Sequence, residues 1–277
     1  MSTIGAVIVS RNDNYGGNLV ERAIYSLNSA IETYDEVILV DYNSRDKTLF
    51  EEVEPYLIMS GKLKVFKVTN EQHKQYIESF SGAQPCNEVL GRNIGIRRAT
   101  ADFIISTNID EIQPPRRYIE NFEHKDKMLT VARHGTTIDH IKSIGEYHEI
   151  DKIRDYLISH EYSQAWAVTR EPWSLVEWPG DFQMAHKDLW YHIRGYDEWL
   201  LGAGIHDSHI HRKVKEMGGD VILSYDIPIY HLDHNKKNDY GENCVGNSNA
   251  CLYGKYVGQL NSKDWGYPDD SFKEFRI

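Results

Sequence analysis

Short apolar runs alternate with helix-like segments along the first 115 residues of the chain. The runs at 5–10, 36–41 and 102–107 are largely apolar, as in strands that are buried on both faces, and 63–68 is a further strand-like run. Between the first two runs, Leu19, Ala23, Leu27 and Ile31 recur at helical spacing, and 46–59 and 86–100 are also helix-like. This alternation predicts an α/β fold with a mostly parallel central sheet, right-handed crossovers and flanking helices.

The rest of the chain is less regular. Short strand-like runs at 128–133 and 165–170 flank a charged helical stretch at 148–159. Residues 183–218 read as two helical pieces around a glycine-rich turn, and 220–231 reads as a pair of strands. We expect a single domain over 1–277, with a first half at 1–115, a second half at 116–234 and a polar tail at 235–277.

Composition narrows the classes of function. The net charge is −11, with 42 acidic against 31 basic residues, which is unfavourable for nucleic-acid binding. No run approaches the 18 apolar residues of a membrane span, and the first residues lack the basic region of a signal peptide. The three cysteines form no Cys-x-x-Cys pair, so we expect a reducing, cytoplasmic location.

Polar residues follow three of the predicted strands. Ser10, Arg11 and Asp13 follow the first, Asp41 and Asn43 end the second, and the fourth leads into Asn108, Asp110 and Glu111. Ligands of open α/β sheets bind at the carboxyl ends of such strands, where a carboxylate can hold a divalent cation against a diphosphate. The sequence has neither Gly-x-Gly-x-x-Gly nor a P-loop motif. Taken alone, Asp41 and Asp46 are more typical of turn or helix-cap positions, and Asp46 in particular fits a helix N-cap.

Three segments carry a family resemblance. Val-Asp-Tyr-Asn-Ser-Arg-Asp-Lys-Thr at 40–48 resembles the Val-Asp-x-x-Ser-x-Asp-x-Thr signature of family 2 glycosyltransferases, which have the GT-A fold. Gly-Arg-Asn-Ile-Gly at 91–95 is similar to that family's Ala-Arg-Asn-x-Gly helix, and Asn-Ile-Asp at 108–110 occupies its Asp-x-Asp position. The match covers residues 4–115. It implies nucleotide-sugar contacts from Ser10, Arg11, Asp13, Asp41, Asn43, Arg92 and Asn108, and a metal ligand at Asp110.

Asn108 departs from the family pattern, which usually has Asp at this position. An amide is a poorer cation ligand than a carboxylate. The departure predicts either weaker metal binding or an enzyme that does not need the metal.

A second motif lies in the other half of the chain. Gly-Asp-Phe at 180–182, Gly-Tyr-Asp-Glu at 195–198 and Gly-Ala-Gly-Ile-His-Asp at 202–207 are similar to the acceptor-side motif of galactosyltransferase-like GT-A enzymes. Asp207 falls on the general base of inverting members, although it also fits the cap of a helix with Ile210 and Val214 on its apolar face. His206 replaces the usual Glu. The substrate contacts implied here are Trp178, Gly180, Asp181, Glu198, Trp199 and His206, although the two tryptophans equally fit a core.

Two histidines follow the last predicted strand. Many GT-A enzymes place a histidine there as a metal ligand, and His231 and His234 match that position. Imidazole suits Mn²⁺ better than Mg²⁺, and we expect one of these two ions. A purely structural role fits either histidine as well.

Together the resemblances imply a glycosyltransferase. It would move a hexose or N-acetylhexosamine from a nucleotide-diphosphate sugar, with UDP as the expected nucleotide, to a hydroxyl of a glycan, lipid-linked or protein acceptor. Displacement would invert the anomeric centre, with Asp207 as base. Two alternatives stay open. A metal-dependent hydrolase would use His206-Asp207-x-His209-x-His211, and a non-catalytic binding module would account for Asn108 and His206.

Overall fold

The computed structural model describes residues 2–77, 85–160, 180–200, 206–234 and 260–276. Within these ranges a nine-stranded sheet has the order β5-β8-β6-β7-β4-β1-β2-β3-β9. Its strands are β1 (Ile4–Ser10), β2 (Glu36–Tyr42), β3 (Leu63–Val68), β4 (Phe103–Thr107), β5 (Glu111–Ile112), β6 (Lys127–Thr137), β7 (Phe182–His186), β8 (Asp220–Asp233) and β9 (Lys273–Arg276).

Strands β3, β2, β1 and β4 are mutually parallel, as the alternating pattern predicts. Around this parallel centre the pairings β4–β7, β6–β7, β5–β8 and β3–β9 are antiparallel, while β6 and β8 are parallel. The complete sheet is therefore mixed.

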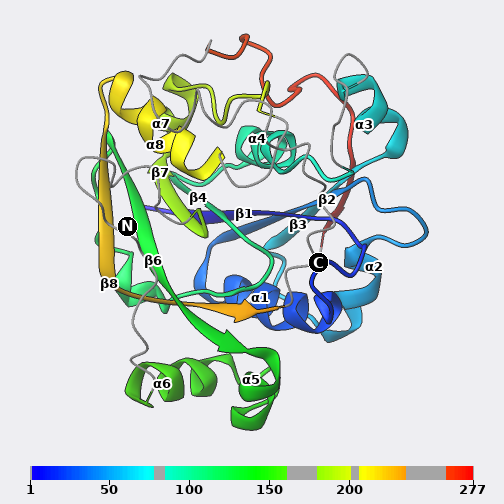
Figure 1. Ribbon diagram of the computed structural model, residues 1–277, viewed down its shortest axis with the longest axis vertical. Coiled ribbons are helices and arrows are strands. Elements are labelled where there is room, and N and C mark those ends of the chain that lie inside the picture. Colours follow the sequence, from blue (N-terminus) through cyan, green and yellow to red (C-terminus); the bar gives the residue numbers. More distant parts are fainter. Residues whose placement is uncertain (1, 78–84, 161–179, 201–205, 235–259, 277) are drawn as a thin grey trace.

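Helices cover both faces of the sheet (Figure 1). They are α1 (Leu19–Thr33), α2 (Leu49–Val53), α3 (Asn70–Ile77), α4 (Glu88–Arg98), α5 (Ile138–Ile144), α6 (Ile150–His160), α7 (Lys187–His192) and α8 (His206–Glu216), with 3₁₀ turns at Glu54–Tyr56 and Arg116–Tyr118. Among the described residues no helix combines the length and apolar character that a membrane crossing needs.

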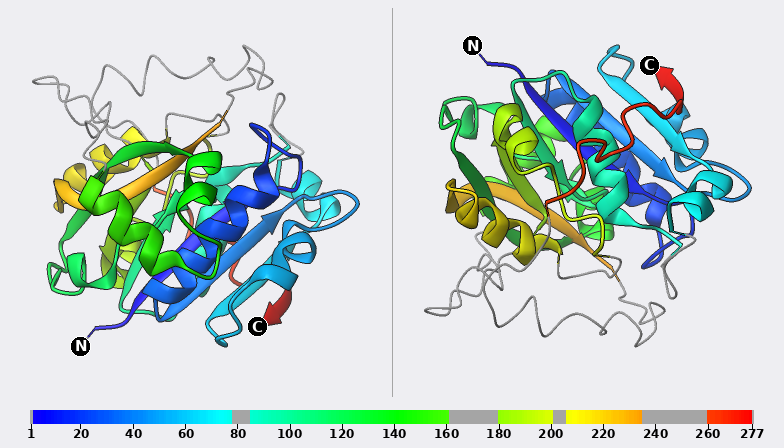
Figure 2. Two further views of the ribbon diagram at one scale, coloured as in Figure 1. Left: turned by 90° about the horizontal axis from the view of Figure 1, so that it is seen from below. Right: turned by 90° about the horizontal axis from the view of Figure 1, so that it is seen from above.

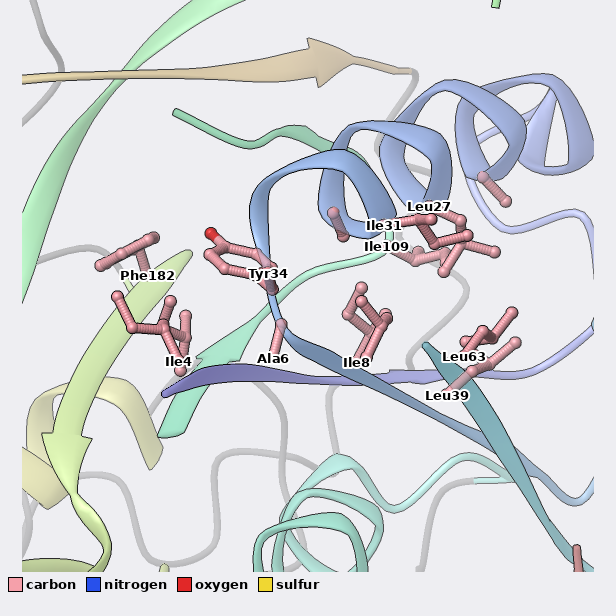
Figure 3. Packing of buried hydrophobic residues seen from close by; sticks show 14 of the residues in the cluster. Ile4, Ala6, Ile8, Leu27, Ile31, Tyr34, Leu39, Leu63, Ile109 and Phe182 are labelled. Atoms are coloured by element: carbon pink, nitrogen blue, oxygen red, sulfur yellow. The ribbon is translucent and has the colours of Figure 1, made fainter. Parts of the chain in front are cut away.

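Alternate residues of β1 enter two separate cores. Ile4, Ala6 and Ile8 pack with Leu27 and Ile31 of α1 on one face (Figure 3). Val7 and Val9 pack on the other face, in a cluster that includes residues of α4, α7 and α8. Since successive side chains of a strand point to opposite faces, both faces of β1 must be apolar, and this explains its uninterrupted run.

Helix α4 lies unusually close to β1. A Cβ at Gly91 would stand 2.5 Å from Val9 Cγ1, and one at Gly95 would stand 2.3 Å from Val7 Cγ1. Both distances are shorter than van der Waals contact permits, so the two glycines of the 91–95 motif allow the helix to rest on the strand. This approach positions Arg92 over the carboxyl ends of β1 and β4.

The structure corrects three of the expected elements. Residues 182–186 form strand β7 rather than the start of a helix, and 220–233 form one long strand rather than two. In the 46–59 segment only Leu49–Val53 is α-helical, beginning at a capping box between Thr48 and Glu51. Thr48, rather than Asp46, is therefore the helix cap.

The described end of the chain packs against the first half. Strand β9 pairs with β3 at the far edge of the sheet, in red in Figure 2. The guanidinium of Arg98 donates to the carbonyls of Gly266 and Tyr267, and the Trp265 side chain is buried. Residues 260–276 thus pack as part of the core around α4 and β3.

Candidate active site

A cavity of about 280 Å³ opens at the carboxyl ends of β1 and β4. Its wall draws residues from loops and helices that are distant in sequence. Eleven of the residues singled out in the sequence line it: Ser10, Arg11, Asp13, Arg92, Asn108, Asp110, Asp181, His206, Asp207, His231 and His234. A second cavity, of about 570 Å³, shares Arg11 and Asp13 with the first.

Asp110 and two histidines converge on one side of the cavity. The register of β5 against β8 pairs Glu111 with His231, and Leu232 N donates to Asp110 O at 2.8 Å, so the histidines are brought alongside Asp110. Asp110 Oδ2 lies 3.1 Å from His234 Nε2 and 3.8 Å from His231 Nε2.

The donor set fits a divalent transition metal. One oxygen and two imidazole nitrogens lie within 4.8 Å of one another, and this mixed set suits Mn²⁺ better than Mg²⁺. The other ring nitrogen of His231, Nδ1, lies 2.8 Å from Asp233 Oδ1. A carboxylate in that position fixes the tautomer that presents Nε2 to an ion.

An arginine that sequence reasoning missed contacts the same carboxylate. Arg22 of α1 is 1% exposed, and its Nη1 lies 2.7 Å from Asp110 Oδ2. Its remaining donors bind the carbonyls of Tyr15 and Gly17. Arg22 therefore ties the β1–α1 loop to the acid of the cluster.

The same loop makes room for His234. Gly16 has a φ of +70°, and a Cβ there would stand 2.2 Å from His234 Nδ1. The Tyr15 ring packs edge-on against the imidazole, with 5.0 Å between ring centroids. Glycine at 16 thus satisfies both the backbone and the space that His234 needs.

Asp207 stands at the start of α8, on the other side of the cavity. Its Oδ1 lies 3.0 Å from Nε2 of His206, which in turn lies 3.4 Å from Glu88 Oε2. Burial by itself would raise the pKa of Asp207, but the positive charges of His206 and Arg92 outweigh burial and hold that pKa well below its usual range. Asp207 is therefore ionised at neutral pH and can accept a hydrogen bond or a proton.

Gly180 is the neighbour that permits this position of Asp207. A Cβ at 180 would stand 1.9 Å from Asp207 Cγ, so no residue with a side chain fits there without moving the carboxylate. Gly180 therefore lies directly beside the Asp207 carboxylate.

Four residues that line the cavity form a continuous polar chain. Arg92 donates from Nη2 to Asn108 Oδ1 at 2.5 Å, and Asn108 donates from Nδ2 to Asp181 Oδ1 at 2.8 Å. Arg133 of β6 donates to the same oxygen at 2.7 Å. Arg133, like Arg22 and Glu88, was not singled out from the sequence.

Other predicted contacts lie away from this cavity. The Asp41 carboxylate is fully buried and accepts from the backbone of Leu49 and Phe50 at the start of α2, and burial raises its pKa to about 6. Asn43 binds Pro85 O and Asn70 through its side chain.

Glu198 and Trp199 also serve the packing of the fold. Glu198 accepts from Gly266 N at 2.7 Å and from Asn93 at 3.1 Å. The Trp199 ring packs edge-on against His209. Trp178 lies outside the described residues. Glu111 is fully buried behind the cavity wall, where burial, with the charges of Asp181 and Asp110, raises its pKa well above the usual range.

The histidines of the hydrolase alternative do not converge. His209 Nδ1 lies 3.5 Å from Asp197 Oδ2, and His211 Nε2 lies 3.0 Å from Gln183 Nε2. In the part of the chain that the structure describes, Asp110, His231 and His234 are the only group of three or more potential ligands that meets at one point.

No protein-family model matches the chain, and no curated protein matches it by sequence. Solved structures do match. One is the mannosyltransferase PcManGT from Pyrobaculum calidifontis in complex with GDP-Man and Mn²⁺, with a TM-score of 0.56 and 14% identity, over 96% of this chain and 68% of that one. Another is GalNAc-T7 with UDP, GalNAc and Mn²⁺, with a TM-score of 0.56 and 15% identity, over 85% of this chain and 44% of that one.

At these identities the likeness establishes the fold. The chain has the GT-A fold, as the motifs of its first half predict. This chain thus spans about two thirds of the mannosyltransferase and less than half of GalNAc-T7.

Proposed function

We propose that this protein is a glycosyltransferase that moves a hexose or an N-acetylhexosamine from a nucleotide-diphosphate sugar to a hydroxyl acceptor. The observation that carries the proposal is the pairing, in one cavity, of a potential metal cluster with an ionised carboxylate. Asp110, His231 and His234 line one side, and Asp207 lines the other. The mannosyltransferase structure holds GDP-Man and Mn²⁺, and the GalNAc-T7 structure holds UDP and Mn²⁺.

The donor is assigned to the first half of the chain, residues 1–115. Its nucleoside would lie along Arg11 and Asp13, which join the two cavities. Its diphosphate would lie near Asp110, where a bound Mn²⁺ or Mg²⁺ would neutralise charge on the leaving group. Arg92 adds a fixed positive charge from α4. UDP is the proposed nucleotide, on the resemblance of residues 40–48 and 91–95.

The acceptor is assigned to the second half, residues 116–234. Asp207 would accept the proton of the acceptor hydroxyl as that oxygen bonds to the anomeric carbon and the bond from that carbon to the phosphate oxygen breaks. Displacement by one nucleophile inverts the anomeric centre. His206, 3.0 Å from Asp207, holds the carboxylate in place. The acceptor hydroxyl would belong to a glycan, a lipid-linked sugar or a protein.

A thermal-shift panel tests the donor site. UDP, GDP, CMP and TDP sugars are each added to the full chain with and without Mn²⁺. A ligand that binds only the folded state at a hundredfold excess over Kd stabilises it by about 2.7 kcal/mol, which is roughly 5–8 °C for a chain of this length. We expect such a shift with UDP sugars and Mn²⁺, and its loss in Asp110→Ala.

Turnover separates an enzyme from a binding module. Asp207→Asn keeps the size of the side chain but removes the base, so it should retain the donor-induced shift and lose transfer. No shift with any nucleotide would sink the glycosyltransferase assignment. Full function in Asp207→Asn would leave a non-catalytic module.

A further inference from the structure

Asn108 occupies the position where the family signature has an acid, and both ends of its amide are engaged. Its oxygen accepts from the Arg92 guanidinium at 2.5 Å, and its nitrogen donates to the Asp181 carboxylate at 2.8 Å. A guanidinium can only donate and a carboxylate can only accept, so the orientation of the amide is dictated by its two neighbours.

The neighbours of Asn108 are themselves fixed. Arg92 is 3% exposed and also donates to Ser106 Oγ at 2.5 Å. Asp181 is 3% exposed, and Arg133 donates to the same oxygen that Asn108 contacts. Movement of Asn108 away from Asp181 would break the bond from its Nδ2 to a buried carboxylate, which is costly next to a protein interior.

A carboxylate at 108 would suit Arg92 but not Asp181. Its second oxygen would face the Asp181 oxygen at the distance that the N–H now spans, with no proton between them. Like charges at such a distance repel, and because Asp181 is buried, water screens them only in part.

We propose that Asn108 is a positioning residue, selected as an amide because it joins Arg92 of the first half of the chain to Asp181 of the second half. This inference rests on the proposed function for what the two halves do. It replaces the interpretation of Asn108 as a weakened metal ligand, and it leaves Asp110 as the only acid in the cluster of three potential ligands found among the described residues.

The test is a double-mutant cycle on the full chain, with Asn108→Asp, Asp181→Asn and the two together. Three quantities are measured: the Kd for Mn²⁺ alone by titration with electron paramagnetic resonance, the Tm, and kcat with UDP sugars. Asn121→Asp adds the same charge at an exposed turn and serves as the matched control.

We expect Asn108→Asp to lower the Tm and to lower kcat at least tenfold, while the Kd for Mn²⁺ stays within twofold. The double variant should recover most of both losses, because an amide at 181 can donate to a carboxylate at 108. If Asn108→Asp does not fold, the double variant should still fold.

Two results would overturn the inference. One is Mn²⁺ binding at least tenfold tighter in Asn108→Asp with kcat retained. The other is a cycle in which the double variant is no better than the sum of the single variants, or does not fold. The Mn²⁺ and Tm measurements decide this even if no nucleotide sugar is turned over, so failure of the proposed function is distinguished from failure of the inference.

Discussion

Lys213 of helix α8 and Asp197 form a buried ion pair. Both side chains have an exposed fraction of 0%. The Lys213 ammonium donates to the Asp197 carboxylate and, at 2.8 Å, to Gly195 O. Because α8 carries His206 and Asp207 in its first turn, this pair fixes the helix against the turn at 195–197. It is therefore a sensitive test of how the Asp207 side of the cavity is held.

Lys213→Met keeps the aliphatic stem and removes the charge. The substitution leaves the buried Asp197 carboxylate without its main cation. The neighbouring His209 does not replace that charge, because burial lowers the pKa of His209 to about 4 and the imidazole is neutral at neutral pH. Removal of one partner of a buried ion pair destabilises proteins by about 3–5 kcal/mol. In a chain of this size that corresponds to a fall in Tm of roughly 6–10 °C.

The assay is thermal unfolding followed by circular dichroism, with urea unfolding to confirm the free energy. Lys142→Met is the matched control, because Lys142 pairs with Glu21 at 2.9 Å while both side chains are nearly half exposed. Such exposed pairs contribute little, so no measurable change is expected there. Asp197→Asn combined with Lys213→Met removes both charges and should recover more than half of the lost Tm. A fall below ~2 °C in Lys213→Met, or no recovery in the double variant, would refute the reasoning.

Three further predictions follow from single neighbours in the structure. Gly16→Ala should weaken Mn²⁺ binding at least tenfold by calorimetry, because its methyl group would displace His234; unchanged affinity would argue against His234 as a ligand. Gly180→Ala should reduce kcat at least tenfold while Mn²⁺ affinity is kept, because its methyl group would displace Asp207; unchanged turnover would argue against that carboxylate as the base. Burial lowers the pKa of His209 to about 4, so as pH falls from about 6.5 to 4 the unfolded state takes up a proton that the folded state does not. Stability should therefore fall by about 3 kcal/mol across that window in urea unfolding, and His209→Gln should flatten this slope; an equal slope in both proteins would show that His209 is not its source.

The first half of the fold could be predicted because local pattern and tertiary role agree there. Strands β1, β2 and β4 are buried on both faces and read as apolar runs, and the stripe of α1 through Leu19 and Leu27 is fully buried. Strand β7 was misread because all five of its residues are buried, which removes the alternation, and because α7 follows it without a break.

The long strand β8 was misread for a different reason. A pair of strands is expected over 220–231, but β8 continues through Pro228 as one strand, with a register shift against β6 between Val131 and Arg133. A proline is tolerated where a strand leaves its regular ladder, and only the partner strand shows where that happens.

In the site, sequence reasoning identified the charged residues that belong to motifs and missed those that lie outside any motif. Arg22 had a signal that could have been used. Together with Ser26, Ser29 and Thr33 it forms a polar stripe along α1 at spacings of three and four, and all four are buried. A stripe of small polar residues headed by an arginine, next to an apolar stripe, indicates a buried anionic partner. That the partner is Asp110, 88 positions later, follows only from the sheet register.

The two sides of the cavity are built on the same principle. Asp110 is held by Arg22 and His234, and Gly16 leaves the space that His234 occupies. Asp207 is held by His206 within the field of Arg92, and Gly180 leaves the space that Asp207 occupies. In each case a carboxylate stays ionised because positive charge lies next to it, from Arg22 at Asp110 and from Arg92 and His206 at Asp207, and its histidine or its own side chain fits only where a neighbour lacks a side chain. The two glycines contact different sides of the cavity, so Gly16→Ala should reduce metal binding and Gly180→Ala should remove the base. If both substitutions changed metal binding and turnover in the same way, the two sides would not act as separate units.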